Sequence, residues 1–326
     1  MNRAEMFKFI VCISAIIAAI AVPVILSSIY WTSVLTMIVI NTLMTTSLRN
    51  ISLMGEFSLG HVGFMCLGAY TSALLTMKTG LPFVLALLAA GLMSGLLAFA
   101  LGYPFMRVKG IYFVVLTLMT AESIRRSAYY WKGLTGGVDG LIGFPGAGVL
   151  SIPGLGQIDF NGYTEYYYLT LTVVCASLFL LYRLEKSKLG FTWMAIRDSD
   201  RMAGSVGVNI LRYKVICFSV SCFFAGLAGS LFAHFEQALG AQDTAYFGVL
   251  TSIYFLIYMV VGGKTRFAGP IVGAVVLSLV SEFTRPIEEY QSLVIGVIAI
   301  GIVMIIPDGI ISIPEKIRKW RKGSPA

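Results

Sequence analysis

The side chains best suited to catalysis or metal binding are few and scattered in this chain of 326 residues. Its two histidines, His61 and His234, lie far apart and have no partner at metal-ligand spacing. None of the five cysteines belongs to a Cys-x-x-Cys pair, and all lie in apolar runs: Cys12, Cys66, Cys175, Cys217 and Cys222. We therefore predict no metal site and no Cys/His nucleophile, and we interpret the cysteines as small hydrophobes inside helices.

One short motif looks like part of a nucleotide site. Gly262-Gly263-Lys264-Thr265 resembles the end of a phosphate-binding loop, but Tyr258 stands where that pattern requires glycine. The motif also follows an apolar helix rather than a strand, so we interpret it as a basic turn. We predict that this chain is not an enzyme and that it binds no cofactor of its own.

The composition indicates which class of protein this is. The chain is 57% apolar and only 12% charged, with a mean hydropathy of +0.85. A soluble protein needs roughly twice that charged fraction, which disfavours a soluble enzyme, a nucleic-acid binder, a disordered chain and a disulfide scaffold. We predict an integral membrane protein, in which the net charge of +8 reports orientation.

Apolar runs long enough to cross about 30 Å of hydrocarbon recur ten times. The first run has basic residues before it, as a signal peptide does, but it is too long for one and is expected to be retained. The glycine-rich third run has a partly re-entrant segment as its alternative. The predicted spans are 9–30, 32–48, 57–77, 82–103, 110–127, 164–182, 214–234, 246–262, 268–284 and 290–307.

Basic residues support this count. With the N-terminus inside, about nineteen of the 24 Lys and Arg residues fall on the cytoplasmic side, as positive-inside orientation requires. We predict an all-α polytopic protein with both termini cytoplasmic. Residues 1–326 then form one transmembrane domain, with an ordered external excursion at 128–163 and a cytoplasmic loop at 183–213. Small residues at Gly91-x-x-x-Gly95 and Gly269-x-x-x-Gly273 predict close helix packing.

Ionisable residues in or beside the spans are functional candidates, because charge is costly in hydrocarbon. They are Glu56, His61, Glu122, Glu236 and Glu282. Nearly all lie near span ends, so a structural role and a place along a pathway both stay open. Glu122 can pair with Arg125 or Arg126 at helical spacing. A proton- or sodium-driven carrier is disfavoured, since we find neither a central carboxylate nor repeated halves.

The cytoplasmic loop carries the most informative pattern. Residues 191–202 are predicted to form one short helix, in which Trp193 and Ile196 share a face while Arg197 and Arg201 mark the wetter side. The helix is too charged to enter the bilayer and too short to be a domain. We expect it to lie across the cytoplasmic face and dock a partner. The alternative is an ordinary interfacial amphipathic helix.

This loop resembles the coupling loop of binding-protein-dependent ABC importer permeases, specifically the branched-chain amino acid permease family. The motifs that carry the resemblance are Ser58–Tyr70, Lys109–Phe113 with Thr117 and Glu122, Thr135–Leu141, Leu189-Gly190, Ala195–Asp198, Tyr213-Lys214, Gly262-Gly263 and Gly269–Ala274. The chain departs from the family pattern at Phe191, Thr192 and Asp200, which affects the fine fit to an ATPase subunit. Its N-terminal span resembles the longer of the two family paralogues.

The resemblance implies two sets of functional residues. Those implied to couple this chain to an ATPase are Gly190, Ala195, Ile196, Arg197, Asp198, Asp200, Ala203 and Gly207. Those we place along the pathway or its gate are His61, Tyr70, Glu122, Thr135, Gly136, Gly137 and Asp139.

The resemblance also implies a function. The chain would be the permease subunit of an ATP-driven importer of branched-chain or related hydrophobic amino acids in the plasma membrane, which is the inner membrane if the host is Gram-negative. Its partners would be a homologous second permease, two cytoplasmic ATPase subunits that use the ATP, an extracytoplasmic substrate-binding protein and the lipid bilayer, with no nucleic acid. The alternatives are a permease for urea, an amide or a sugar, and a stand-alone carrier or channel.

Overall fold

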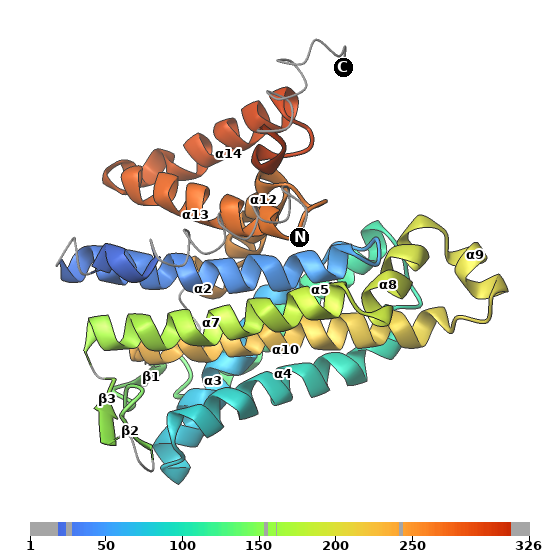
Figure 1. Cartoon of the computed structure of the whole chain (residues 1–326). Helices are drawn as coiled ribbons and strands as arrows, with labels where there is room; N and C mark the ends of the chain where they lie inside the picture. Colours follow the sequence, from blue (N-terminus) through green and yellow to red (C-terminus); the bar gives the residue numbers. More distant parts are fainter. Residues whose placement is uncertain (1–18, 24–27, 153–155, 161, 241–243, 314–326) are drawn as a thin grey trace.

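The computed structural model describes residues 19–23, 28–152, 156–160, 162–240 and 244–313. Nine long helices in this part of the chain coincide with nine of the predicted spans (Figure 1). They are α2 (Ile29–Ser52), α3 (His61–Thr79), α4 (Phe83–Phe105), α5 (Ile111–Tyr130), α7 (Tyr163–Glu185), α10 (Ile210–Glu236), α12 (Val249–Gly262), α13 (Ala268–Phe283) and α14 (Glu288–Ile305). The remaining span, 9–30, lies largely outside the described residues.

The helices fit an all-α membrane protein. Five segments are long and apolar enough to cross a membrane, namely α2, α4, α7, α10 and Tyr290–Ser312. Helices α12 and α13 are apolar but shorter, at 14 and 16 residues. The count of ten spans and the cytoplasmic placement of both termini therefore stay predictions.

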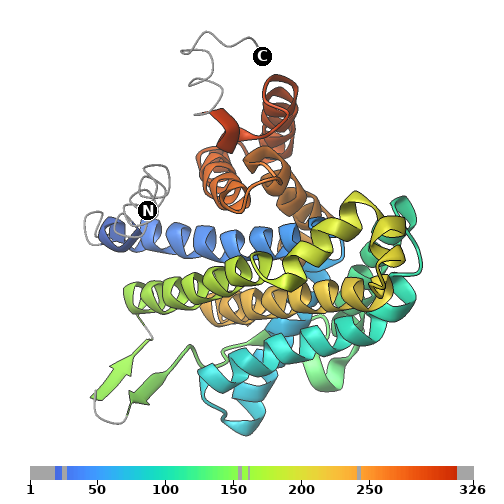
Figure 2. The ribbon, with the colours of Figure 1, turned by 45° about the vertical axis from the view of Figure 1, so that its right-hand side comes forward.

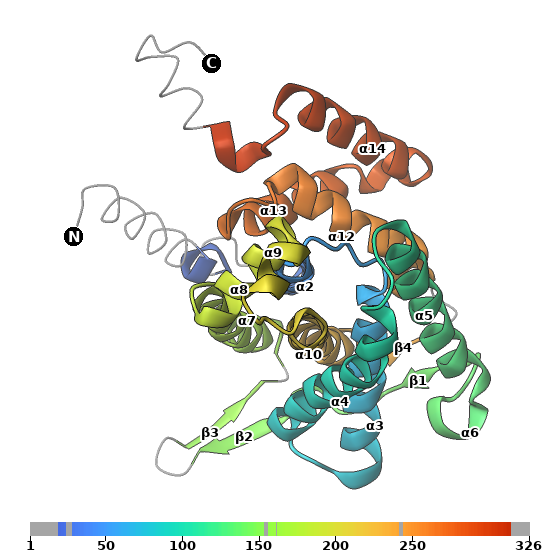
Figure 3. The same cartoon turned by 90° about the vertical axis from the view of Figure 1, so that its right-hand side faces the viewer.

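Helix α10 is the centre of the bundle. It packs against α2, α3 and α4, with α7 alongside, and most of its apolar span is buried (Figure 3). Where it crosses α3 the two backbones touch: a Cβ on Gly68 would lie 2.3 Å from the Gly226 carbonyl oxygen, and one on Gly229 would lie 1.9 Å from that of Met65. Only glycine permits this approach.

Helices α12, α13 and α14 form a second group on the other side of α2 (Figure 1). A Cβ on Gly273 would lie 1.9 Å from the Tyr258 carbonyl oxygen, so the predicted close packing at Gly269-x-x-x-Gly273 is confirmed. Gly91 and Gly95 face α10 instead, and a Cβ on either glycine would contact Phe223. The chain thus comprises two helical groups that share α2.

At one end of the bundle, the predicted single helix over 191–202 is wrong. The segment forms α8 (Lys188–Asp198) and α9 (Asp200–Ser205), separated at Ser199 by extended backbone with φ −162° and ψ 109°. The Ser199 hydroxyl accepts a hydrogen bond from the Met202 amide at 3.3 Å, so this serine caps a new helix. We call this part of the molecule the α8–α9 end.

The third span also begins later than expected. Helix α3 starts at His61 rather than at residue 57, and residues 53–60 before it are not helical. This connection is nonetheless mostly buried, with Leu53, Met54, Glu56 and Ser58 inside. A buried, irregular connection needs polar partners for its side chains and backbone, and these are found in the site described below.

The opposite end holds residues 128–163 and most of the β structure, and we call it the hairpin end. Strand β2 (Val149–Ile152) pairs with β3 (Gly156–Asp159), and this hairpin projects from the bundle in Figure 2. Strand β1 (Leu141–Ile142) pairs with β4 (Ala238–Leu239), just after α10. Residues 128–163 were predicted to form an excursion rather than a helix, and this is wrong at its start, since α5 continues to Tyr130 and α6 (Lys132–Thr135) follows. The shorter elements α11 (Thr244–Phe247), η1 (Arg285–Ile287) and η2 (Ile310–Ser312) complete the described chain.

Candidate functional site

The inner face of α8 and α9 is fixed to the bundle. Trp193 is fully buried, and its indole Nε1 donates to the Tyr213 carbonyl oxygen at 2.9 Å, at the start of α10. Ile196 and Ala203 are buried on the same side. A Cβ on Gly190 would lie 2.1 Å from the Glu185 carbonyl oxygen, so α8 starts in backbone contact with the end of α7. The segment therefore has a defined position relative to α7 and α10.

The outer face of the same two helices is exposed and partly apolar. Phe191, Met202 and Val206 are 60%, 74% and 79% exposed. Arg197 and Asp198 lie exposed on the same element. Large apolar side chains beside charges, on an element too polar for lipid, are typical of a surface that a protein partner covers.

The eight predicted coupling residues differ in their exposure to solvent. Gly190, Ile196 and Ala203 are buried, and Asp200 is partly buried. The exposed ones are Ala195, Arg197, Asp198 and Gly207. Arg197 also packs against Gly55, which has a φ of +88° and lies in the 53–60 connection. The first group can position the segment, and the second can touch a partner.

An ionic cluster joins α9 to the buried connection before α3. The Lys214 ammonium lies 3.3 Å from a Glu56 oxygen and 3.6 Å from an Asp200 oxygen, and Lys109 pairs with Asp200. The Gly110 amide donates to the other Glu56 oxygen at 3.2 Å. Four separate segments therefore meet here. Glu56 was a candidate as an ionisable residue beside a span, and Lys214 belonged to the Tyr213-Lys214 motif, but their pairing was not predicted.

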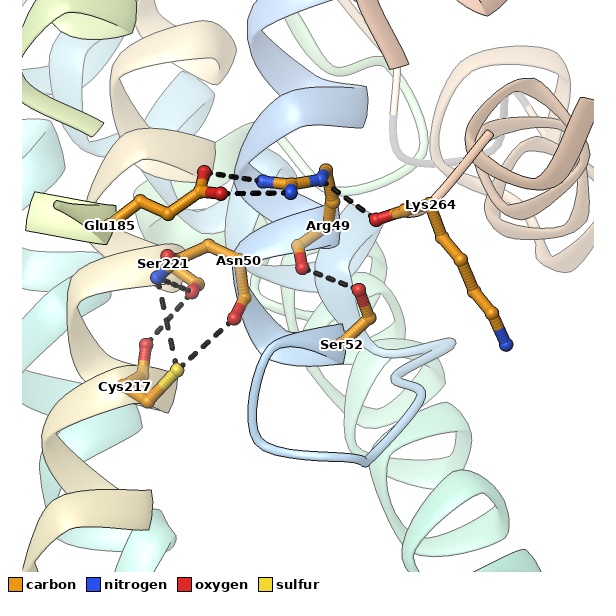
Figure 4. A network of polar contacts seen from close by, with 7 residues as sticks. All are labelled: Arg49, Asn50, Ser52, Glu185, Cys217, Ser221 and Lys264. Atoms are coloured by element: carbon orange, nitrogen blue, oxygen red, sulfur yellow. Dashed lines mark hydrogen bonds and ion pairs between the residues drawn. The ribbon is translucent and has the colours of Figure 1, made fainter. Parts of the chain in front are cut away.

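A second network lies at the end of α2 (Figure 4). The Arg49 guanidinium donates to both Glu185 carboxylate oxygens, at 2.7 and 3.1 Å, and to the Lys264 carbonyl oxygen at 3.0 Å. One residue on, the Asn50 amide donates to the Ser221 hydroxyl of α10 at 2.9 Å. Arg49 was not among the predicted site residues. The sequence signal that could have indicated it is a lone basic residue near the end of an apolar span, because a buried charge requires a partner.

The structure does not gather the predicted pathway residues into one site. His61 is buried, with its Nε2 2.9 Å from the Ser47 hydroxyl of α2. Tyr70 lies nine residues further along α3, or roughly 14 Å of helix rise, where its hydroxyl donates to the Leu239 carbonyl oxygen. Thr135 is the last residue of α6, and its hydroxyl donates to the carbonyl oxygens of Ala128 and Trp131.

The remaining pathway candidates also lie in different places. Gly136 and Gly137 adopt positive φ and shape the turn after α6, while Asp139 is exposed. Glu122 accepts hydrogen bonds from both Arg125, at 2.6 Å, and Arg126, at 2.8 Å, so its predicted pairing is confirmed. All three of these residues belong to α5, so the Glu122 carboxylate is paired within its own helix.

Helix α5 has one packed face and one open face. Thr117 and Ala121 contact α3 so closely that a Cβ on Gly63 would lie 2.4 Å from the Ala121 Cα. The open face carries Ser123, Arg126 and Ser127 beside exposed apolar residues. Polar side chains on a spanning helix normally face protein or a water-filled path rather than lipid.

Long apolar helices whose large apolar side chains are exposed on the outside of the bundle define an all-α, multi-span membrane protein. Residues 24–303 match the family model described as branched-chain amino acid transport system / permease component. The chain belongs to this family, and the resemblance seen in the sequence is confirmed.

Individual relatives agree with the family. The high-affinity branched-chain amino acid transport system permease protein LivM of Salmonella typhimurium is 29% identical over 84% of this chain and 68% of its own length. LivH, a permease protein of the high-affinity branched-chain amino acid transport system of Escherichia coli, is 23% identical over 44% of this chain and 45% of its own. The guanosine ABC transporter permease protein NupQ of Bacillus subtilis is 26% identical over 55% and 59%. No solved structure matches.

Proposed function

We propose that this chain is the transmembrane permease subunit of an ATP-driven importer that moves branched-chain or related hydrophobic amino acids across the plasma membrane. The chain itself would perform no covalent chemistry and bind no cofactor. Two separate cytoplasmic ATPase subunits would use the ATP, and a substrate-binding protein would deliver the amino acid at the hairpin end. The α8–α9 end would then face the cytoplasm.

The observation that carries this proposal is the two-sided α8–α9 segment. Its buried residues, Trp193, Ile196 and Ala203, fix it to α7 and α10, while Phe191, Met202 and Val206 stay exposed. A segment held rigidly on one side and open on the other can pass a push from a docked partner to the helices behind it.

Within this proposal the substrate would pass between this chain and a homologous second permease, along the open face of α5. Ser123 and Arg126 on that face offer hydrogen bonds to a zwitterionic amino acid, and the apolar residues beside them suit its side chain. Glu122 would hold Arg126 in place through the 2.8 Å hydrogen bond.

Purification from native host membranes in mild detergent tests the proposal. We expect two ATPase subunits and a second permease to co-purify, because the exposed apolar surface is built for a partner. Arg197→Glu, or deletion of Gly207, should separate ATP hydrolysis from uptake while the chain still inserts. Lys186→Glu, an exposed change at the end of α7, is the matched control. Normal uptake by the Arg197→Glu variant would show that the segment is not the lever.

A second candidate substrate class comes from the relative NupQ, whose name assigns it guanosine. A permease for a nucleoside or another small solute would share the same coupling segment, since that segment does not touch the substrate. Uptake of radiolabelled leucine and of radiolabelled guanosine by the same reconstituted complex distinguishes the two. A stand-alone carrier would bring no ATPase subunit through purification.

A further inference from the structure

Arg49 joins the two helical groups of the molecule at the α8–α9 end. It lies in the last turn of α2, which packs against α7 and α10 on one side and against α12 and α13 on the other. Its side chain is 2% exposed, and that of its partner Glu185 is 13% exposed. A planar guanidinium can bind a carboxylate with two nitrogens and still donate from the third, which an ammonium group cannot do with the same geometry.

The acceptors on one side belong to the start of the α8–α9 segment. Glu185 is the last residue of α7, and its backbone touches α8 at Gly190. Two Arg49 nitrogens bind its carboxylate (Figure 4). A displacement of α8 that carries the end of α7 with it, through the backbone contact at Gly190, therefore moves or breaks this ion pair.

The acceptor on the other side belongs to the turn between α12 and α13. Arg49 Nε donates to the Lys264 carbonyl oxygen, and its guanidinium lies 5.8 Å from the centre of the Phe267 ring. Phe267 in turn meets the Tyr182 ring of α7 edge to face at 5.3 Å. The Lys264 ammonium lies 5.1 Å from the Phe57 ring, so the turn also touches the 53–60 connection.

We propose that Arg49 is a positioning residue of the transport cycle, which transmits the displacement of α8 and α9 to the α12–α13 hairpin so that both helical groups move together. This inference rests on the proposed function, because it requires a partner that displaces α8. It adds a residue outside the coupling segment and assigns the motion it controls. Without Arg49, α8 would still dock and move, but α12 and α13 would not follow.

Distance measurements by pulsed electron paramagnetic resonance on the full reconstituted complex test this. Spin labels go on cysteines placed at Lys186 beside α8 and at Thr265 in the α12–α13 turn, each measured against a label at Lys78 on the far end of α3. All three positions are exposed. Cys12 and Cys175 are replaced by serine, and the buried Cys66, Cys217 and Cys222 are kept.

In the parent protein we expect both distances to change when a non-hydrolysable ATP analogue is added. In Arg49→Met the change at Lys186 should persist while the change at Thr265 disappears, and uptake should fall by about tenfold, the size of effect that a broken coupling residue produces. Arg183→Met is the matched control. Arg183 is exposed and lies on α7 two residues before Glu185, where its guanidinium is 5.9 Å from the centre of the Phe179 ring. The Arg183→Met variant should behave as the parent does.

Arg49→Lys keeps the positive charge, and it tests the inference even if Arg49→Met does not fold. A lysine that pairs with Glu185 should fold and bind the ATPase subunits, yet lose the Lys264 contact and most of the change at Thr265. If Arg49→Lys matches the parent in both distances and in uptake, Arg49 merely neutralises Glu185 and the inference is overturned. A Thr265 change that survives in Arg49→Met overturns it as well. If neither distance changes in the parent protein, the proposal that a docked partner displaces α8 is wrong, and the inference about Arg49 is wrong with it.

Discussion

The two ends of α10 are held by different chemistry. At the α8–α9 end, Lys214 forms buried ion pairs with Glu56 and Asp200. At the hairpin end, the His234 ring nitrogens meet only uncharged partners, the Ser72 hydroxyl and the Pro145 carbonyl oxygen, each at 2.9 Å. The rings of Phe83 and Phe144 pack edge to face on the same imidazole.

The two ends should therefore differ in how strongly they resist a displacement of the segments that contact α10. Buried charges depend strongly on their partners, because separating them leaves an uncompensated charge in a poor solvent. Neutral hydrogen bonds cost less when broken, but they fix direction closely. Under the proposed function, the ionic end is where an ATPase subunit would displace α8 and α9, and the neutral end is where the segment that contains Phe144 and Pro145 is held against His234 of α10.

The largest effect is expected where α3 and α10 cross between these two ends. Gly229→Val would drive a side chain into the Met65 carbonyl oxygen, which is backbone and cannot move aside, so we expect little or no folded protein. Size-exclusion chromatography in detergent measures the folded fraction. Gly301→Val on α14, where a Cβ meets open space, is the control. A folded Gly229→Val protein would show that the two ends are not rigidly linked.

Breaking the ionic end should come next. Lys214→Met leaves the Glu56 carboxylate buried without its cation, whereas Asp200 keeps Lys109. We expect a loss of about 3–5 kcal/mol, seen as a lower thermal midpoint in detergent. Adding Glu56→Gln should recover part of it, since the two changes are coupled. Lys186→Met, at an exposed position, should change nothing. A Lys214→Met protein as stable as the parent would remove the contrast between the ends.

Breaking the neutral end should cost less. Ser72→Ala removes a partner from both His234 and Ser230, and we expect a loss of about 1–3 kcal/mol in the same thermal measurement. Ser123→Ala, which removes only a bond to the backbone of its own helix, is the matched control. A loss as large as that of Lys214→Met would contradict the distinction drawn here.

The smallest effect on stability is expected on the open face of α5. Arg126 is 60% exposed and shares Glu122 with Arg125, so Arg126→Gln should cost about 0.5 kcal/mol or less. Uptake should nevertheless fall, because this face lines the proposed route. Parallel thermal and uptake assays separate the two effects. Unchanged uptake would place the route elsewhere.

Local patterns predicted what depends on neighbouring residues along the chain. The pairing of Glu122 with Arg125 and Arg126 follows from helical spacing alone, and so does the shared buried face of Trp193 and Ile196. The break at Ser199 was missed, although serine followed by Asp200 is a helix-start signal, because the apolar spacing ran through it.

Composition and hydropathy are enough to predict an apolar chain made of membrane-spanning helices, because a bilayer leaves the backbone few other ways to satisfy its hydrogen bonds. Which charged residues pair with one another depends on how the helices pack. Arg49 and Glu185 are 136 residues apart, and Glu56 and Lys214 are 158 apart. No spacing along a helix encodes such pairs. They form because the helices pack together, with α3 and α10 in backbone contact at Gly68 and Gly229, and this packing brings distant segments side by side.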